Sequence, residues 1–356
     1  MARTRVRTAI AGVGGYAGGE LARLLLAHPR LRETKPLLLA RVADEAPSGR
    51  IPLEQIQPQL SLGAGHRQPE ILAFNWKLIR DEGIEIVFLA LPHENSREWA
   101  PQWLEAGVRV IDLSGAWRLK DANLRAVYKL HDDDAALAAK LQNEAVYGCP
   151  ELHREAIAKA RLVANPGCYS TSIILAVAPL VRAGVVDVDH GIISDSKSGV
   201  SGAGKNPSPK THFMHAADNL SAYSVFGHRH TCELLEQLGL TEQQIQFTPH
   251  LLPIPRGIMS TIYLRLAKHM TAAEIEGILR EFYAASPMVR IRAAGDLPQI
   301  QQSVRTNYCD LGFTLAADGK RLVMVSCLDN LLKGASGQAV QNMNVMCGWN
   351  EDEGLQ

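Results

Sequence analysis

The sequence predicts an α/β protein of two domains, the first built on a parallel sheet and the second an α+β domain built on a mixed sheet. Two observations lead to this prediction. Up to about residue 166, short apolar runs alternate with helical patterns, as in βαβ units, and beyond residue 190 strand patterns dominate. The length of 356 residues also exceeds what one hydrophobic core usually serves.

The first strand pattern, Val6–Ala11, leads into a glycine-rich turn, Gly12–Glu20, and then into an apolar helix, Leu21–Leu26. Both a G-x-G-x-x-G/A register and a G-x-x-G-x-x-G register fit this turn. Glycine lets the backbone approach a pyrophosphate, and the helix N-terminus supplies N–H donors to the anion. The alternative is an ordinary tight turn, but the order of strand, turn and helix favours a Rossmann-type dinucleotide site. Its expected cofactor contacts are Gly12, Gly14, Gly15, Tyr16 and Ala17.

The second strand pattern, Pro36–Ala40, ends at Arg41, where an NAD-binding unit usually carries an acidic residue for the ribose 2′-hydroxyl. An arginine suits a 2′-phosphate instead, so we expect NADP(H) as the cofactor and Arg41 as one of its contacts. Two alternatives stay open. Arg41 could be a solvated side chain that follows a strand, and Asp44 is near enough in the sequence to keep NAD in consideration.

Two more apolar runs, Ile84–Leu91 and Val108–Leu113, fit strands of the same parallel sheet. Ligands bind at the carboxyl ends of such strands, so the loops that follow, Pro92–Ser96 and Ser114–Arg118, should line a crevice for cofactor and substrate. The candidate contacts at this edge are Leu91 and Pro92 for the cofactor and Arg118 for a bidentate anion contact.

Cys168 follows a short predicted strand, Arg161–Ala164, and precedes an apolar helical run, Thr171–Leu180. A thiol at a helix N-terminus faces unpaired N–H groups and the positive end of the helix dipole, which stabilise a thiolate nucleophile. The turn between strand and helix begins at Asn165, a candidate substrate contact. The alternative is that Cys168 is a small buried hydrophobic residue, as many free cysteines are.

The second domain contains a histidine cluster, His228-Arg229-His230, just before a helical run, Glu233–Leu238. A catalytic cysteine needs a partner that exchanges protons near neutral pH, which histidine does. One histidine would act as acid or base and Arg229 as a cationic anchor, although a single histidine is more often structural. The loop after the predicted strand Gly191–Ser196, from Ser198 to Lys205, could hold an anion or contact a nicotinamide.

The remaining patterns complete a mixed sheet with a helix packed on it. Residues 248–257 read as a proline-punctuated strand leading into a strand at Ile258–Leu266, and Ala272–Tyr283 as a helix with Thr271 and Glu274 in a capping box. Later strands follow at Asn307–Leu315 and Arg321–Cys327. We expect the first domain to span residues 1–166 and to be completed by a C-terminal helix within 330–356, and the second to span 167–329, with a homodimer or homotetramer plausible.

Composition limits the partners. The 37 basic and 37 acidic residues balance, so no bulk attraction to nucleic acid or to a membrane surface is expected. The start, Met1–Arg7, reads as neither a secretory signal nor a membrane span. The six cysteines show no paired C-x-x-C spacing, so we expect reduced thiols, no metal site and a cytoplasmic location.

Several long ungapped motifs give the chain a resemblance to a known family. They are GVGGYAGGEL at 12–21, LPHENS at 91–96, NPGCY at 165–169, SGVSGAGK at 198–205, HRHTCE at 228–233, PHLLPIPRGI at 249–258, TNYCD at 306–310 and DNLLKGASGQAVQNMN at 329–344. With these motifs the chain resembles the N-acetyl-gamma-glutamyl-phosphate reductases of the aspartate-semialdehyde dehydrogenase superfamily. The resemblance implies NADPH-dependent reduction of N-acetyl-L-glutamyl 5-phosphate to N-acetyl-L-glutamate 5-semialdehyde and phosphate, in arginine biosynthesis.

The resemblance also assigns residue roles. It implies that Cys168 forms a thioester, that His228, ahead of His230, is the acid or base, and that Glu233 orients a member of this cluster. Arg118 matches a phosphate contact, and Ser198, Gly199 and Asn330 match nicotinamide contacts. The chain departs from the family pattern at Cys232, where relatives have proline, which weakens the placement of Glu233.

Other functions remain as alternatives. A related reductase could act on a carrier-linked aminoadipyl phosphate or on aspartyl phosphate. A cysteine acyltransferase or hydrolase would share the thiolate and the histidine but needs no dinucleotide turn. A non-catalytic nucleotide sensor would bind NADPH without using Cys168.

Overall fold

The computed structural model describes residues 5–41, 46, 48–63, 66 and 68–356, so Asp44 and the first four residues lie outside the described residues. The chain divides into two compact units. Unit 1 runs to Lys120 and takes in Tyr128–Asn165 and Ser336–Gln356, and unit 2 consists of Asp121–Val127 and Pro166–Ala335. The sequence places the corresponding boundaries after residue 166 and at residue 330.

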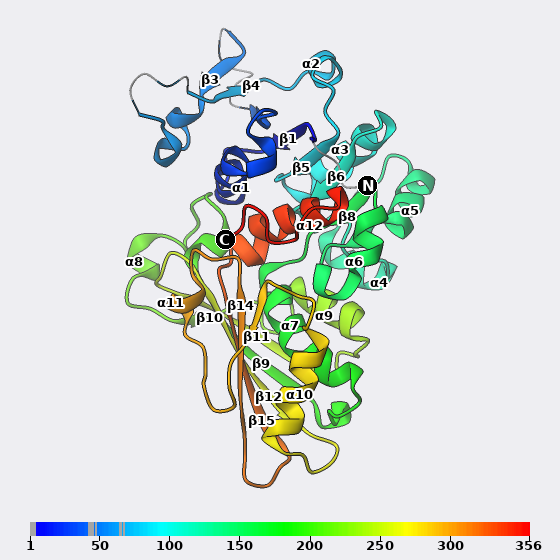
Figure 1. Ribbon diagram of the computed structural model, residues 1–356, viewed down its shortest axis with the longest axis vertical. Coiled ribbons are helices and arrows are strands. Elements are labelled where there is room, and N and C mark those ends of the chain that lie inside the picture. Colours follow the sequence, from blue (N-terminus) through cyan, green and yellow to red (C-terminus); the bar gives the residue numbers. More distant parts are fainter. Residues whose placement is uncertain (1–4, 42–45, 47, 64–65, 67) are drawn as a thin grey trace. The chain divides into compact units, whose positions relative to one another are not determined.

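Unit 1 is built on an eight-stranded sheet with the strand order β3-β4-β2-β1-β5-β6-β8-β7, in which only β3 is antiparallel to its neighbour among the described strands. β1, β5, β6 and β8 can be followed side by side in Figure 1. The predicted parallel sheet is confirmed. Its strands are β1 (Thr8–Ala11), β2 (Leu37–Leu39), β3 (Arg50–Pro52), β4 (Glu70–Leu72), β5 (Ile86–Leu89), β6 (Arg109–Asp112), β7 (Val146–Tyr147) and β8 (Leu162–Ala164).

Helices bury the central strands of this sheet on both faces, which explains why β1 and β5 are apolar and buried along their whole length. The C-terminal helix α12 contacts α1, α6 and β6, so the end of the chain packs within unit 1. The helices of unit 1 are α1 (Tyr16–Ala27), η1 (Pro29–Leu31), η3 (Leu53–Gln55), η4 (Pro58–Leu60), α2 (Trp76–Asp81), α3 (His93–Glu105), α5 (Ala135–Glu144), α6 (Pro150–Lys159) and α12 (Gly337–Cys347).

Two predicted loops of unit 1 are partly helical. Helix α1 begins at Tyr16 rather than at Leu21, because Gly18 and Gly19 continue the helix in close contact with the turn. Residues 93–96, predicted as part of a loop, are the first turn of α3. Pro92 is the N-cap of that helix. Because proline is common both in loops and at helix starts, the local sequence alone does not distinguish the two.

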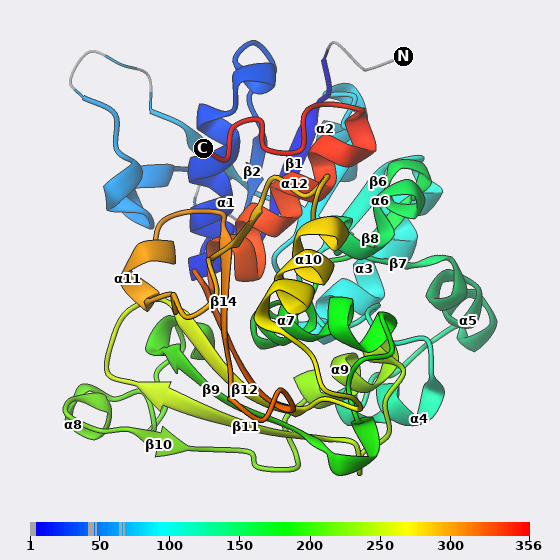
Figure 2. The ribbon, with the colours of Figure 1, turned by 60° about the horizontal axis from the view of Figure 1, so that its bottom comes forward.

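Unit 2 is built on a seven-stranded mixed sheet with the strand order β10-β11-β9-β12-β15-β14-β13, which confirms the predicted architecture. Helix α7 lies against β12, β14 and β15, and α9 and α10 pack on α7, as Figure 2 shows. The strands are β9 (Ile192–Gly199), β10 (Ser221–Ala222), β11 (Ile245–Leu252), β12 (Ile258–Arg265), β13 (Val289–Ile291), β14 (Cys309–Leu315) and β15 (Arg321–Leu328).

The two faces of this sheet differ. Along β9 and β12 buried residues alternate with more exposed ones, because every second side chain points toward the helices. On the other face Ile193 and Tyr263 are each 45 % exposed. The helices of unit 2 are α4 (Ala122–Arg125), η5 (Ala126–Tyr128), α7 (Cys168–Arg182), η6 (Val188–His190), η7 (Val200–Ala203), α8 (Phe213–Ala216), α9 (His230–Leu238), α10 (Ala272–Phe282), α11 (Ile300–Ser303) and the π-helix η8 (Leu332–Ser336).

Some local features of unit 2 agree with the sequence prediction and others differ in their bounds. The capping box of α10 is confirmed, with the Thr271 side chain accepting from the Glu274 N–H and the Glu274 carboxylate accepting from the Thr271 N–H. Residues 245–265 form two separate strands, β11 and β12, joined through the proline-rich turn. β9 extends to Gly199, so the predicted loop at Ser198 begins within a strand.

Within the described residues no helix is long and apolar enough to cross a membrane. All six cysteines are free thiols. Four of them, Cys149, Cys309, Cys327 and Cys347, are buried, and Cys168 and Cys232 are half-buried.

Candidate active site

The glycine-rich turn packs backbone against backbone. Gly12 has φ +99°, and a Cβ there would collide with the carbonyl oxygen of Ala90, just beyond β5. A Cβ on Gly18 would likewise overlap the carbonyl of Gly12. Helix α1 therefore starts close to the sheet, which is the geometry that a dinucleotide turn requires.

The N-terminus of α1 is open to a ligand. Its N-cap residue is Gly15, the first turn has no acidic residue, and no side chain caps it. Such a helix start presents N–H donors and the positive end of the dipole to an anion. Tyr16 is 49 % exposed beside this turn. The residues thus fit a pyrophosphate held at the turn.

The other predicted cofactor contacts of unit 1 lie at strand ends. Arg41 is exposed two residues after β2. Leu91 is half-buried and touches the position where a Gly12 Cβ would lie, and Pro92 is the exposed N-cap of α3. These positions at the carboxyl ends of β2 and β5 agree with the expected edge of the sheet.

Arg118 and Asn165 are joined within unit 1. The Arg118 side chain is 8 % exposed, its Nε donates to the Asn165 carbonyl at 2.7 Å, and one of its terminal nitrogens donates to the Leu113 carbonyl at 2.9 Å. Asn165 is fully buried, and its side-chain oxygen accepts from Asn342 of α12 at 3.0 Å. Both side chains therefore brace the ends of β6 and β8, in addition to any substrate contact.

In unit 2, Cys168 is the first residue of α7. Its N-cap is Gly167, no side chain caps the helix, and no acidic residue lies in the first turn. The positive end of the helix dipole at this end therefore stabilises an anion. A Cβ on Gly334 of η8 would lie 2.7 Å from the Cβ of Cys168, so the π-helix packs directly beside the thiol residue.

Gly167 is held from two sides. Its N–H donates to the Glu233 carboxylate at 3.0 Å, and Glu233 is fully buried in the first turn of α9. A Cβ on Gly167 would collide with the imidazole of His230. The Glu233 carboxylate is also 4.0 Å from His230 Nε2. Glu233 thus fixes both the start of the cysteine helix and one face of the histidine cluster.

One pocket of unit 2 brings together most of the predicted chemistry. It contains the predicted nucleophile, both histidines and the predicted cationic anchor, with the end of β9 forming one wall. Its lining is Cys168, Tyr169, Ser198, Gly199, Gly202, Ala203, Tyr223, His228, Arg229, His230 and Leu251. Asn330 does not line it directly but donates to the Ser201 hydroxyl at 2.9 Å and accepts from the Gly257 N–H at 2.8 Å.

The two histidines differ electrostatically. The His230 N–H donates to Nδ1 of His228 at 3.2 Å, so the neutral His228 ring carries its proton on Nε2. Burial, with a smaller contribution from Arg229, lowers the pKa of His228 to about 4. His228 is therefore a neutral hydrogen-bond donor at pH 7. His230 packs edge-to-face on it at 4.7 Å between ring centroids and faces the Glu233 carboxylate.

Two tyrosines of the pocket were missed by sequence reasoning. Tyr169 donates to the His250 carbonyl at 2.8 Å and receives a longer hydrogen bond from Tyr223 at 3.4 Å. Burial raises the pKa of Tyr169 and raises that of Tyr223 to about 12, so both hydroxyls stay protonated. Both rings lie 5.6 Å from the His228 ring. The position of Tyr169 next to Cys168 was the available signal.

A buried carboxylate on the segment after β15 was also missed. Asp329 accepts from the N–H groups of Arg305, Leu331 and Leu332 at 2.8, 2.8 and 3.1 Å. It thereby shapes the start of η8, which packs beside Cys168. The bonds to Leu331 and Leu332 follow the local spacing of a helix-capping aspartate, whereas the bond from Arg305 spans 24 residues and has no local signal.

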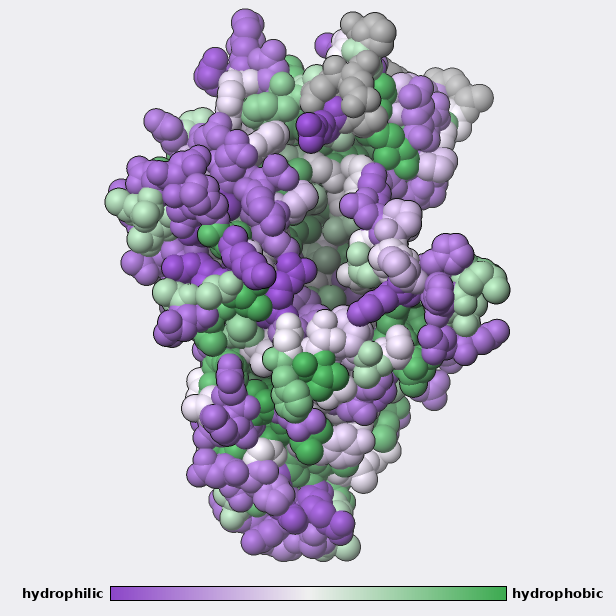
Figure 3. Space-filling view, turned by 180° about the vertical axis from the view of Figure 1, so that it is seen from behind, coloured by the Kyte–Doolittle hydropathy of each residue, from purple (hydrophilic) through white to green (hydrophobic). Residues whose placement is uncertain are grey.

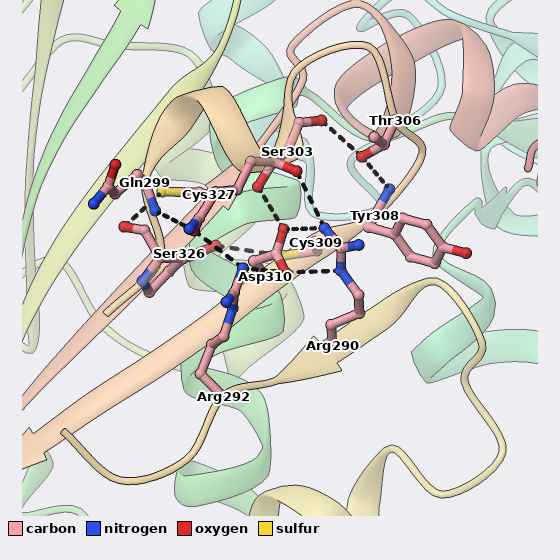
Figure 4. Close-up of polar contacts among 12 residues, drawn as sticks. Arg290, Arg292, Gln299, Ser303, Thr306, Tyr308, Cys309, Asp310, Ser326 and Cys327 are labelled. Atoms are coloured by element: carbon pink, nitrogen blue, oxygen red, sulfur yellow. Dashed lines mark hydrogen bonds and ion pairs between the residues drawn. The ribbon is translucent and has the colours of Figure 1, made fainter. Parts of the chain in front are cut away.

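The loop that contains Arg305 is itself anchored through Ser303 and Asp310, whose contacts with Arg290 Figure 4 shows. The buried Asp310 carboxylate accepts two hydrogen bonds from Arg290, at 2.8 and 2.6 Å, and one from Ser303 at 2.6 Å. The Arg290 guanidinium also lies 4.2 Å from the centroid of the Tyr308 ring. This cluster holds residues 303–310 in place and so supports the Arg305 contact with Asp329.

Family models match both parts of the chain. Residues 7–160 match the NAD binding domain of semialdehyde dehydrogenase, and residues 168–330 match the semialdehyde dehydrogenase dimerisation domain. The chain is also similar to the solved aspartate semialdehyde dehydrogenase II of Vibrio cholerae, with a TM-score of 0.68 and 18 % identity over 97 % of this chain and 98 % of that one. At that identity the likeness concerns the fold.

Curated relatives are much closer in sequence. The N-acetyl-gamma-glutamyl-phosphate reductases of Desulforapulum autotrophicum and Desulfotalea psychrophila are each 43 % identical over 99 % of this chain and 98 % of their own length. The enzyme of that name from Methanopyrus kandleri is 41 % identical over 98 % of this chain and 97 % of its own length. The chain therefore belongs to the semialdehyde dehydrogenase family and, within it, to the N-acetyl-gamma-glutamyl-phosphate reductases.

Proposed function

We propose that this enzyme reduces N-acetyl-L-glutamyl 5-phosphate with NADPH to N-acetyl-L-glutamate 5-semialdehyde and phosphate, as a step of arginine biosynthesis. The names of the full-length relatives support the substrate. The single observation that carries the chemistry is Cys168 at the uncapped start of α7, in one pocket with His228, Arg229 and His230.

In this mechanism the Cys168 thiolate attacks the acyl carbon and forms a thioester as phosphate leaves. A nicotinamide bound by unit 1 would supply the hydride that reduces this thioester. The start of α7 and the Nε2–H of neutral His228 stabilise the oxyanion of the resulting thiohemiacetal. Proton transfer then accompanies its collapse to the aldehyde and the free thiol.

We assign the proton to His230 rather than to His228, which the sequence favours. A histidine with a pKa of about 4 is rarely protonated at pH 7, whereas His230 faces the Glu233 carboxylate, which stabilises an imidazolium. Glu233 is then an orienting residue. Arg229, exposed in the pocket lining, is the proposed anchor for the phosphate, and Arg118 is a second candidate.

We propose NADP(H) as the cofactor, bound by unit 1. The family match supports a nicotinamide cofactor, and the exposed Arg41 after β2 supports a 2′-phosphate. The glycine turn with Tyr16 and Ala17 would hold the pyrophosphate, with Leu91 and Pro92 at its edge. We propose Ser198, Gly199 and Asn330 as nicotinamide contacts. We also propose that residues 1–166 and 330–356 form the cofactor domain and that residues 167–329 form the catalytic domain.

We propose a homodimer or homotetramer assembled through unit 2. The family model of residues 168–330 is a dimerisation domain, and the mixed sheet leaves one face with exposed apolar side chains, including Ile193 and Tyr263. Single exposed apolar residues are common, and Figure 3 shows hydrophobic residues interspersed with hydrophilic ones on the face that it presents. Light scattering at several protein concentrations tests this, and a monomer at micromolar concentration would contradict it. Six free thiols support a cytoplasmic location.

The reverse reaction tests the function. We expect phosphate-dependent formation of NADPH from N-acetyl-L-glutamate 5-semialdehyde and NADP. The same assay with aspartate semialdehyde and with a carrier-linked aminoadipate semialdehyde should give a kcat/KM at least tenfold lower. No turnover of any of the three by folded protein would refute the reductase, and a preference for another semialdehyde would refute the acyl group.

A further inference from the structure

A glutamine far from the glycine turn in sequence closes over it. Gln57 lies between η3 and η4 and is 8 % exposed. Its Nε2 donates to the carbonyl of Val13 at 3.0 Å and to that of Gly15 at 3.3 Å. Its Oε1 accepts from Gln59 at 2.7 Å, so the amide is held by three hydrogen bonds. All of these residues belong to unit 1.

These contacts set the direction of two peptide planes. In a planar trans peptide the N–H points opposite to the C=O. The carbonyls of Val13 and Gly15 point at Gln57, so the N–H groups of Gly14 and Tyr16 point away from it. Among the described residues, neither of these two N–H groups has a hydrogen-bond acceptor. They are therefore free to bind an anion at the uncapped start of α1.

Gly19 makes room for this glutamine. A Cβ at Gly19 would lie 2.5 Å from Gln57 Nε2. Gly19 sits inside α1 with an ordinary helical φ, where alanine would favour the helix by about 1 kcal/mol. The dinucleotide fingerprint does not call for a glycine at this position. The close approach of Gln57 explains it.

We propose that Gln57 is a positioning residue of the cofactor site, which aims the N–H group of Gly14 at the dinucleotide pyrophosphate and reinforces the direction that α1 gives to the N–H group of Tyr16. The proposal rests on the proposed function in that the ligand is a nicotinamide dinucleotide. Gln57 does not touch the cofactor and acts through the turn. The Gly15 carbonyl also accepts from the Gly19 N–H at 2.9 Å, so α1 still holds the plane that carries the Tyr16 N–H. Loss of Gln57 frees the Val13–Gly14 plane to rotate, so the pyrophosphate must order it on binding.

Binding measurements on the full chain test this. In Gln57→Ala the Kd of NADPH, measured by fluorescence, should rise about tenfold, which corresponds to about one hydrogen bond. Gln57→Glu keeps the size of the side chain but lacks the N–H donors, so it should lose at least as much. The Kd of adenosine 2′-monophosphate, which has no pyrophosphate, should stay within twofold of wild type, as should kcat at saturating NADPH.

An NADPH Kd within twofold of wild type in Gln57→Ala would overturn the proposal. Equal weakening of NADPH and of adenosine 2′-monophosphate would also overturn it, because it would reveal a general loss of structure. Failure of the wild-type chain to bind NADPH at all would refute the proposed function instead.

A double-mutant cycle gives an independent test. Gly19→Ala should weaken NADPH binding in the wild type by displacing Gln57, but it should add less than twofold in the Gln57→Ala background, where the space is empty. Gly277→Ala is the matched control, since Gly277 lies inside α10 with no atom within 4 Å of an added Cβ. Additive effects of the Gly19 and Gln57 changes would overturn the proposal.

Discussion

Two helices of this protein begin in almost the same way but lie in different surroundings. α1 follows the glycine turn in unit 1, and α7 follows Asn165-Pro166-Gly167 and lies in unit 2. Each has a glycine N-cap in extended conformation, no side-chain cap and no acidic residue in its first turn. Both therefore present the same positive electrostatic end to an anion.

The neighbours of the two N-cap glycines make the difference. A Cβ on Gly15 would come no closer than 3.9 Å to the Gly12 carbonyl, whereas one on Gly167 would collide with His230. The Gly167 N–H is also bound by Glu233. The start of α1 is thus left open for an external phosphate group, and the start of α7 is enclosed around a thiol that the helix itself carries. The two helix starts have the same electrostatic character, so the residues packed around them account for their different accessibility.

The largest effect should follow from removing the proposed nucleophile at the start of α7. Cys168→Ala should lower turnover by on the order of 10⁴-fold or more, because no thioester can form. The Kd of NADPH should stay within twofold, because α1 is untouched. Steady-state assays with fluorescence titration check this. Activity above about one per cent of wild type would rule out the proposed nucleophile.

Exchanging the two N-cap glycines for alanine sharpens the contrast. Gly167→Ala should displace His230, lower kcat by on the order of 10²-fold and destabilise the fold by about 1–3 kcal/mol. Gly15→Ala should change the free energy of unfolding by less than about 0.5 kcal/mol, since the methyl group has room in the protein. Urea denaturation and kcat measurements distinguish the two, and similar losses in both variants would break the comparison.

The histidine cluster at the enclosed start of α7 should also make the free energy of unfolding depend on pH. The pKa of His228 is lowered from 6.5 to about 4 in the folded chain, so below pH 6.5 the unfolded chain takes up a proton more readily than the folded one. The contribution of His228 to the free energy of unfolding is therefore highest above pH 6.5, and it decreases as the pH falls from 6.5 toward 4. The decrease amounts to about 2 kcal/mol at pH 5.

Urea midpoints at pH 7 and pH 5 measure that loss. In His228→Gln the difference between the two pH values should shrink by the same amount, because the titrating group is gone. An unchanged difference would show that His228 titrates normally. In the same series, His230→Gln should lower kcat by on the order of 10²-fold, as expected for a proton carrier. A larger loss of kcat in His228→Gln would reverse our assignment.

The smallest effect concerns unit 1, which contains the open start of α1, and is a change in cofactor preference. Arg41→Asp should shift the ratio of kcat/KM for NADPH over NADH by about tenfold or more toward NADH, because it removes a 2′-phosphate partner and supplies an acceptor for the 2′-hydroxyl. Lys77→Asp makes the same charge change at an exposed position on α2 and should leave the ratio unchanged. An unaltered ratio in Arg41→Asp would remove it from the site.

Local patterns determined a large part of this protein. The glycine turn, the apolar strands of the parallel sheet, the capping box of α10 and a cysteine at the start of a helix could all be predicted, since each depends on residues that are neighbours in the chain. The two-unit α/β architecture followed from the order of those elements. The roles of the predicted site residues stay predictions.

Tertiary structure decided what surrounds the two helix starts. Gln57 reaches the glycine turn across 44 residues, and Glu233 reaches Gly167 across 66, so no spacing rule connects them. The electrostatic difference between His228 and His230 likewise depends on burial and on the Glu233 carboxylate. The sequence shows only two histidines two positions apart and does not reveal this difference. The sequence placed a cysteine and a glycine turn at the starts of helices. Packing determined that one end stays open and the other is enclosed, because desolvation and close contacts arise only in the folded chain.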